Sequence, residues 1–302
     1  MKRDLLTILD LNREEIEALI ARARELKALH YQRRNPTPLA GKILAMIFDK
    51  PSTRTRVSFE AGIAQLGGTS IYLAPGQTQM SRQEPVSDTA RVLSRYVDGV
   101  VIRTFAQETV EELARHATIP VVNGLTDTHH PCQVLSDLMT MEERFGQLSG
   151  LKVAWVGDGN NMANSWITAA MHLDFALYLA CPQGYEPDAA LLQQARTNGR
   201  HIYLDRDPRG AVRDVHVINT DVWASMGQET EAAARREIFK PYQVNAELLK
   251  LARPEAIVLH CLPAHREEEI TAAVLDGPQS AAWDQAENRL HFQKALLEWL
   301  LG

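Results

Sequence analysis

The first half of the chain alternates between short apolar runs and segments in which apolar residues recur at helical spacing. The runs predict buried strands and the periodic segments predict amphipathic helices. Because strands that are apolar throughout must be covered on both faces, the alternation is typical of a parallel α/β sheet. Asp88 is expected to cap the helix that starts there. Strands are predicted at 42–48, 70–74, 99–104 and 120–124, and helices at 12–29, 57–67, 88–97, 109–117 and 132–146.

The same alternation restarts after Gly150, with a strongly apolar helix at the C-terminal end. We therefore predict an α/β protein of two doubly wound parallel-sheet domains joined by helices. Residues 1–146 form the first domain, residues 147–283 form the second, and the helix within 284–302 packs back on the first. The stretch 220–244 is predicted to be the least structured part, and long loops of this kind are usually functional or mobile.

Composition narrows the class of protein. The chain has 302 residues, 45% of them apolar and 23% charged, with a formal charge of -6 and no basic patch, which argues against a nucleic-acid partner. The longest apolar runs are strand-sized, so no membrane partner is expected. Asp4 and Asp10 interrupt what would be the apolar part of an export signal. Cys132, Cys181 and Cys261 are widely separated, which suits a reducing cytoplasm, and a cytoplasmic location is expected.

Hydroxyl and guanidinium groups gather where the first strand gives way to a helix. Ser52, Thr53, Arg54, Thr55 and Arg56 form one turn in "PSTRTR". A helix N-terminus with such donors is a natural site for an anion, above all phosphate. The alternative is a Ser/Thr helix cap with two surface arginines. The spaced glycines and lysine of a nucleotide loop are missing. Because Arg56 lies two residues past Arg54 on the helix, it is expected to point away from such a ligand and to pair with a carboxylate.

A second polar motif, "THHPCQ", lies between a strand and the long helix at 132–146. His130 and Gln133 could bind a carbonyl and an amide, and the alternative is a polar loop before a helix-starting proline. A metal site formed by His129, His130 and Cys132 is disfavoured, because their spacing is tighter than that of usual zinc ligands.

Further motifs occupy strand ends, where ligands bind in open α/β sheets. Arg103 lies in "VIRT", at the end of one predicted strand, and "LHCLP" lies at the end of a later one. His260 alone would more often be a satisfied core histidine, and Cys261 a small buried residue. In "VGDGNNMANS", Met162 replaces the third glycine of a dinucleotide turn, so NAD binding is not expected.

Two motifs suit an amino-acid ligand. Asn160 and Asn161 could cap the following helix or bind a zwitterion. In "TDVWASMGQE", Asp221 could hold an ammonium group, and Ser225 to Gly227 could close over a ligand. The alternative for this second motif is a surface loop.

Together the motifs resemble the carbamoyltransferase family along almost the whole chain. The markers are "STRTR", "EPVSDTARVLSRYVD", "HPCQ", "DGNNMANS", "DVWASMGQE" and "HCLP". Cys132, Cys261 and the Ser-Met-Gly loop are similar to the branch of the family whose acceptor is ornithine rather than aspartate. They argue less firmly against N-acylated ornithine or putrescine.

The resemblance implies a role for each motif. It implies catalytic roles for Arg103, His130, Asp221 and Cys261. It implies ornithine binding by Asn161, Asp221, Ser225 and Met226. Gln79 matches a loop that in the family reaches a neighbouring subunit's site, although "SRQEP" has no glycine before its glutamate as many relatives do. The implied carbamoyl phosphate residues are Ser52, Thr53, Arg54, Thr55, Gln79, Arg103, His130, Gln133, Cys261, Leu262 and Arg289.

The resemblance also implies a reaction, in which carbamoyl phosphate and L-ornithine give L-citrulline and phosphate within arginine biosynthesis. It implies no metal or organic cofactor, and a homo-oligomer that is a trimer or an assembly of trimers. Alternatives are another amine acceptor and catabolic citrulline phosphorolysis. From a different class, a non-catalytic anion-binding homologue is disfavoured because it should have lost some of these side chains.

Overall fold

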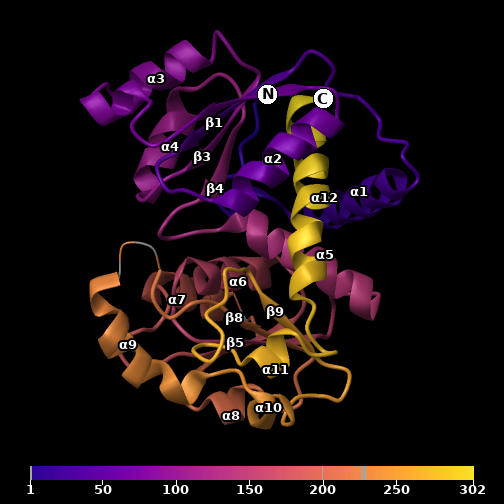
Figure 1. The fold of residues 1–302 in the computed structure, drawn as a ribbon, viewed down its shortest axis with the longest axis vertical. Helices are drawn as coiled ribbons and strands as arrows, with labels where there is room; N and C mark the ends of the chain where they lie inside the picture. The colour runs from indigo at the N-terminus through magenta and orange to yellow at the C-terminus, as the bar shows by residue number, and fades with distance from the viewer. Residues whose placement is uncertain (1, 199, 226, 228) are drawn as a thin grey trace. The chain divides into compact units, whose positions relative to one another are not determined.

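The computed structural model describes residues 2–198, 200–225, 227 and 229–302 (Figure 1). The chain divides into two units, one running to Met139 and including Glu287–Gly302, the other comprising Thr140–Ala286. The division falls within α5 (Pro131–Phe145), whereas the boundary predicted near Gly146 lies just beyond this helix. Among the described residues, no helix is long and apolar enough to cross a membrane.

The first unit contains a four-stranded parallel sheet in the order β2-β1-β3-β4. Its strands are β1 (Ile43–Phe48), β2 (Thr69–Leu73), β3 (Gly99–Arg103) and β4 (Val121–Leu125). Chain order reverses between β1 and β3, so the carboxyl ends of these two strands form a topological switch point. The unit's helices are α1 (Arg13–Tyr31), α2 (Thr53–Gln65), α3 (Val86–Leu93), α4 (Gln107–His116), the first part of α5 and most of α12 (Ala282–Leu301), with short 3-10 turns η1 (Ile8–Asp10) and η2 (Gln79–Arg82).

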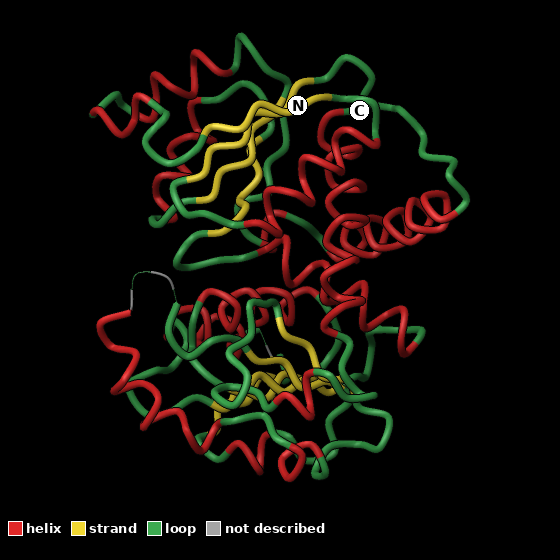
Figure 2. The backbone as a smooth tube through the Cα atoms, in the orientation of Figure 1, coloured by secondary structure: helices red, strands yellow, loops and turns green. Residues whose placement is uncertain are grey.

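The second unit contains a five-stranded parallel sheet in the order β7-β6-β5-β8-β9. Its switch point lies between β5 and β8. The predicted doubly wound α/β class is confirmed in both units, and Figure 2 shows the strands grouped in two sheets. The elements are β5 (Lys152–Val156), α6 (Asn161–His172), β6 (Ala176–Ala180), α7 (Ala189–Thr197), β7 (Ile202–Asp205), α8 (Pro208–Ala211), β8 (Val217–Thr220), η3 (Glu229–Glu231), α9 (Ala232–Phe239), η4 (Lys240–Tyr242), α10 (Ala246–Leu249), β9 (Ile257–His260) and α11 (Ala272–Leu275).

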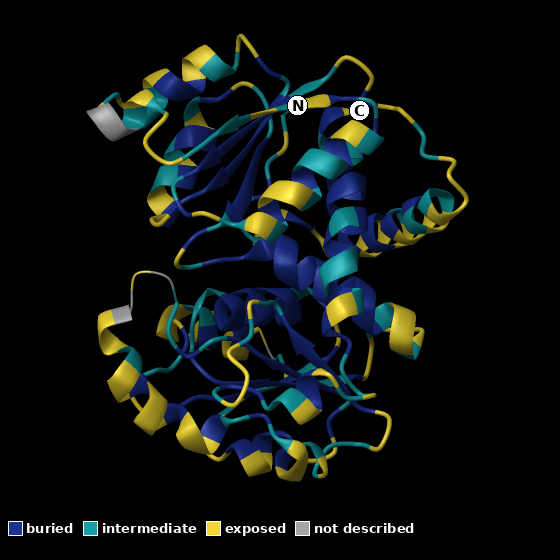
Figure 3. Ribbon diagram, in the orientation of Figure 1, coloured by how far each residue is buried: buried dark blue, intermediate teal, exposed yellow. Residues whose placement is uncertain are grey.

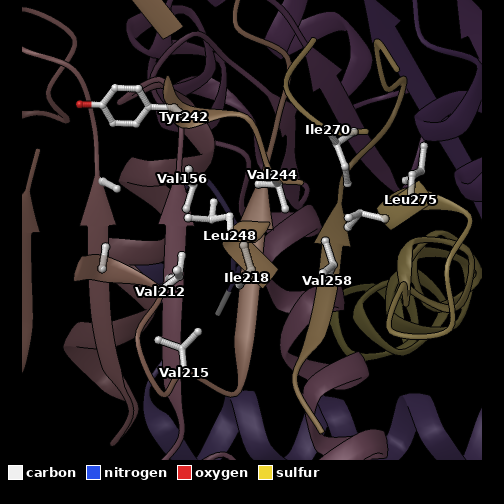
Figure 4. Packing of buried hydrophobic residues seen from close by; sticks show 14 of the residues in the cluster. Val156, Val212, Val215, Ile218, Tyr242, Val244, Leu248, Val258, Ile270 and Leu275 are labelled. Atoms are coloured by element: carbon white, nitrogen blue, oxygen red, sulfur yellow. The ribbon is translucent and has the colours of Figure 1, made fainter. Parts of the chain in front are cut away.

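One core cluster fixes the strand ends of the second sheet. Val156, Ile218 and Val258 come from β5, β8 and β9 and are at most 1% exposed (Figure 4). Val212 and Leu248 pack against the same cluster. Full burial of each such side chain contributes about 1.5–3 kcal/mol. These three central strands are correspondingly among the most buried parts of the chain (Figure 3), and the loops that follow them start from fixed positions.

Two local predictions are wrong. Asp88 does not cap its helix, because α3 begins at Val86 after Pro85, whose fixed φ suits a helix start. Asp88 instead lies in the first turn and pairs with Arg91 at 2.9 Å. The stretch 220–244 is not one long loop, since it contains α9 and η4. The buried face of α9 consists of Arg235 and Phe239, and an arginine does not register as apolar in a sequence pattern.

Candidate functional site

The predicted anion site lies at the switch point of the first sheet. Phe48, the last residue of β1, is in register with Arg103, the last residue of β3. The N–H of Asp49 donates to the carbonyl oxygen of Arg103 at 2.8 Å. The "PSTRTR" turn and Arg103 therefore leave the same edge of the sheet from neighbouring strands, as the shared strand-end placement predicts.

The residues of this turn take different positions at the start of α2. Ser52 is the N-cap of α2, and its Oγ accepts from the N–H of Thr55 at 3.1 Å. Arg54 is half-buried in the first turn of α2. Arg56 is exposed and pairs with Glu60 at 3.1 Å, and its guanidinium lies 3.7 Å from the ring centre of Tyr72. The structural role expected for Arg56 is confirmed.

A chain of buried hydrogen bonds joins three helices behind this turn. Arg289, 2% exposed on α12, donates to Thr55 Oγ1 at 2.9 Å and also to Gln133 Oε1 on α5. Gln133 in turn donates to Asp137 Oδ1 at 2.8 Å. Because arginine has donors only, the Thr55 oxygen must accept, and the hydroxyl proton is available to donate elsewhere. The same contacts fix which way the Gln133 amide points.

His130 is a buried histidine whose protonation is disfavoured by the nearby arginines. It is 5% exposed, and its pKa is lowered well below the ordinary value. Burial is the largest cause, followed by the charges of Arg289, Arg103 and Arg54. The structure thus brings together predicted residues from α2, β3, α12 and the loop before α5, with His130 held neutral among three guanidinium groups.

The lowered pKa of His130 predicts an imidazole that stays neutral as the pH falls through 6.5. Two-dimensional NMR of the imidazole groups should show the His130 signals unshifted between pH 8 and about 6, whereas in 8 M urea they should titrate near pH 6.5. Since only the unfolded chain takes this proton, His130 lowers the free energy of unfolding as the pH falls below 6.5. A native-state titration midpoint near 6.5 would contradict the assignment.

Cys132 and Gln79 lie outside this network. Cys132 is fully buried, its Sγ lies 3.5 Å from the carbonyl oxygen of Asn123, and burial raises the pKa of its thiol to about 12. It is an inert packing residue rather than a nucleophile. Gln79 is exposed on η2, beyond the edge strand β2, so its role in a neighbouring subunit's site stays a prediction.

The second switch point carries the motif predicted for an amino-acid ligand. Asn160 caps α6, accepting from the N–H groups of Met162 at 2.9 Å and Ala163 at 3.3 Å, so its capping role is confirmed. Its Nδ2 donates to Asp221 Oδ2 at 3.2 Å. Asp221 directly follows β8, and its Oδ1 accepts from the N–H of Val222 at 2.8 Å.

The predicted ligand residues flank these two. Asn161 is the first residue of α6, and Ser225 follows Asp221 in the same loop; both are half-buried. Met226 lies outside the described residues, so its predicted part in ornithine binding is not placed.

The end of β9 adds a thiol to the same unit. His260 is 1% exposed, accepts from the N–H of Leu262 at 2.9 Å and lies 3.0 Å from Glu269 Oε1, which confirms it as a satisfied core histidine. Cys261, expected to be buried, is half-buried. Side-chain atoms of Asp221, His260 and Cys261 lie within 4.8 Å of one another. Because both nitrogens of His260 are engaged by protein groups, the trio is poorly suited to hold a metal ion.

Two residues of this unit were missed by sequence reasoning. Asp158, at the end of "VGD", and Arg235, on α9, form a buried pair with 3.0 Å between Oδ2 and Nη1. Burial raises the pKa of Asp158 to about 6, Arg235 opposes that rise, and Asp221 adds to it. Asp158 could have been found from the sequence, because a carboxylate that closely follows a central strand lies at the edge of the sheet where ligands bind. The sequence carries no comparable signal for Arg235.

Comparisons with known proteins agree with this division into two halves. Residues 3–143 match the model of the carbamoyl-P binding domain of aspartate/ornithine carbamoyltransferase, and residues 149–300 match its Asp/Orn binding domain. The ornithine carbamoyltransferase of Syntrophus aciditrophicus is 57% identical over 302 residues, covering 100% of both chains. The anabolic ornithine carbamoyltransferase of Pseudomonas aeruginosa is 55% identical over 299 residues, covering 99% of this chain and 97% of that one. The solved ornithine carbamoyltransferase of Pyrococcus furiosus is 51% identical with a TM-score of 0.95, covering 99% and 97% of the two chains.

Proposed function

This chain belongs to the aspartate/ornithine carbamoyltransferase family, and we propose that it transfers the carbamoyl group of carbamoyl phosphate to the δ-amine of L-ornithine, giving L-citrulline and phosphate. The observation that carries the proposal is the gathering of cationic side chains around the first turn of α2. Arg54 lies in that turn, Arg289 donates to Thr55 Oγ1 in it, and Arg103 ends the strand next to β1. The charges of all three arginines lower the pKa of His130, and cations at a helix N-terminus suit a small ligand with a phosphate dianion.

The first unit supplies the chemistry for carbamoyl phosphate. Its phosphate would lie at the first turn of α2, against the N–H groups there and Arg54. Thr55, with its proton available to donate, Arg103 and neutral His130 would hold the carbonyl oxygen, and would stabilise the oxyanion that forms during attack. Gln133, with its orientation set by Arg289 and Asp137, would hold the carbamoyl amide. The leaving phosphate gains negative charge where cations already lie.

The second unit supplies the chemistry for the acceptor. Asp221 would hold the δ-amine, and Asn161 and Ser225 would hold the amino-acid end of ornithine. An alkylamine is largely protonated at pH 7, so it must lose a proton before it attacks the carbonyl carbon. Asp221 and Cys261 have side-chain atoms within 4.8 Å of one another and are the candidates to accept that proton from the ammonium group. The amine is itself the nucleophile, so positioning two substrates supplies much of the rate, up to about 7–11 kcal/mol.

We also infer a cytoplasmic homo-oligomer, a trimer or an assembly of trimers, that works in arginine biosynthesis. Val57 on α2 and Ile71 on β2 are 54% and 48% exposed, and these two elements touch through Arg56 and Tyr72. Large exposed apolar side chains on adjoining elements support an interface between protein chains. The similarity to the anabolic ornithine carbamoyltransferase of Pseudomonas aeruginosa supports the biosynthetic direction.

A citrulline assay with a choice of acceptors tests the proposal. With carbamoyl phosphate present, L-ornithine, N-acetylornithine, putrescine and aspartate are offered at equal concentrations, and carbamoylated product is measured for each. L-ornithine should exceed every other amine by about 100-fold or more in kcat/KM, because a site with fixed polar partners rejects analogues that leave them unpaired. Faster turnover of another amine would reassign the acceptor. Phosphate binding without any carbamoylated product would indicate a non-catalytic homologue.

A further inference from the structure

Arg235 joins the two loops that meet at the switch point of the second sheet. Its Nη1 donates both to Asp158 Oδ2 at 3.0 Å, in the loop after β5, and to the carbonyl oxygen of Trp223 at 2.9 Å, in the loop after β8. The Arg235 side chain is 8% exposed and that of Asp158 is 10% exposed. Arg235 is thus a buried bridge between backbone segments that are remote in sequence.

Trp223, whose carbonyl group Arg235 binds, belongs to the loop that carries the predicted acceptor residues. Trp223 lies between Asp221 and Ser225 in the loop after β8 and is 5% exposed. Its carbonyl group is therefore the point at which the loop carrying the acceptor residues is tied down. The loop after β5 is tied to the same loop a second time, through Asn160 and Asp221 at 3.2 Å.

Arg235 is itself held rigidly. Its Nε donates to Glu231 Oε2 at 3.1 Å, and its guanidinium lies 4.8 Å from the ring centre of Tyr185 and 6.0 Å from that of Phe239. Phe239 also stacks on Trp223, with 6.0 Å between ring centres and 26° between ring planes. Fixed contacts on both sides leave little freedom for the Trp223 carbonyl to move.

We propose that Arg235, together with Asp158, is a positioning residue for the acceptor amine, holding the Asp221–Ser225 loop against the loop after β5. The inference rests on the proposed function, because it takes Asp221 and Ser225 as residues that bind the acceptor. Arg235 does not touch substrate in this role. It acts through the backbone at Trp223, and its loss shifts the Asp221 carboxylate relative to the rest of the acceptor site.

The test compares Arg235→Met with a matched neighbour. Arg236 is the next residue on α9, is 57% exposed and pairs with Glu268 at 2.9 Å. Arg236→Met is therefore the control, because it makes the same substitution at a surface position of the same helix. Arg235→Met should lower kcat/KM for ornithine by about 100-fold, the effect of a small misplacement of reacting groups. The KM for carbamoyl phosphate should change less than about twofold, because Arg235 contacts none of the described residues in α2, β3 and α5 that are proposed to bind that substrate. In Arg236→Met, kcat/KM for ornithine and the KM for carbamoyl phosphate should both stay within about twofold of the wild-type values.

Two more variants keep the test decisive. Arg235→Lys retains a charge opposite Asp158 but loses the planar fork, so it should fall between wild type and Arg235→Met. Asp158→Asn combined with Arg235→Met should be no worse than Arg235→Met alone, because both act through one contact. If Arg235→Met is insoluble, Arg235→Lys decides by the same comparison of ornithine with carbamoyl phosphate.

The outcomes separate this inference from the proposed function. If the wild-type protein makes no citrulline from ornithine, the proposed function fails before any variant is measured. If wild type does so and the Arg235 variants retain its ornithine kinetics, only the positioning role is overturned. Equal damage to both substrates, together with a lowered melting temperature, would show a merely structural role and would also overturn it.

Discussion

Replacing Arg54 with alanine is expected to lower kcat/KM for carbamoyl phosphate by about 10²–10⁴-fold. Arg54 lies half-buried in the first turn of α2, and its charge reaches His130. Hydrogen bonds to a charged group contribute about 1.5–3 kcal/mol each, and a guanidinium can make two of them to one phosphate. Steady-state kinetics with carbamoyl phosphate varied at saturating ornithine, supported by isothermal titration with phosphate, measure the loss.

Arg56→Ala is the matched control for this prediction. Arg56 carries the same charge two residues further along the same helix, but pairs with Glu60 and stacks on Tyr72 at the surface. Exposed ion pairs are worth about 0–1 kcal/mol, so turnover should stay close to wild type. Near-normal turnover and Michaelis constant in Arg54→Ala would remove the anion site from this turn. Equal loss in both variants would mean that overall positive charge matters rather than the position of Arg54.

The division between Arg54 and Arg56 also shows what could be predicted from sequence. Residues two apart on a helix do not share a face, so one of the two arginines had to point away from a ligand at the helix start. Likewise, apolar runs locate strands, and a parallel sheet gathers the residues that follow them at one edge. The placement of the "PSTRTR" turn and of Arg103 follows from those two rules without any knowledge of tertiary contacts.

Asp137 and Arg235 show where such reasoning stops. Asp137 is fully buried in the middle of α5, and its role depends on Gln133 one turn earlier and on Arg289, 156 residues from Gln133 along the chain. Arg235 lies in a polar stretch whose helix is stabilised by burial of a charged side chain against Asp158. A pattern of apolar residues cannot reveal a helix whose inward face contains arginine. Both residues act through side chains brought together only by folding.

Asp221→Ala is expected to lower kcat/KM for ornithine by about 10²–10⁴-fold while leaving carbamoyl phosphate binding nearly intact. Removing one partner of a buried charged pair costs about 3–5 kcal/mol, and the ammonium group of bound ornithine would lose its carboxylate. The substitution also removes the acceptor of the Asn160 amide at 3.2 Å, which loosens the loop after β5. Initial rates with each substrate varied in turn measure both effects.

A loss of kcat/KM that is confined to ornithine is what would identify Asp221 as a residue that binds the acceptor. Asp276→Ala serves as the control, since Asp276 is 51% exposed and pairs with Arg266 at the surface of the same unit, so its loss should leave both substrates unaffected. Asp221→Asn keeps an oxygen for Asn160 but carries no charge, so it separates the two contributions. If charge is what holds the amine, Asp221→Asn should be nearly as impaired as Asp221→Ala. If Asp221→Asn is close to wild type, Asp221 acts only by holding the loop, and the δ-amine must be held elsewhere.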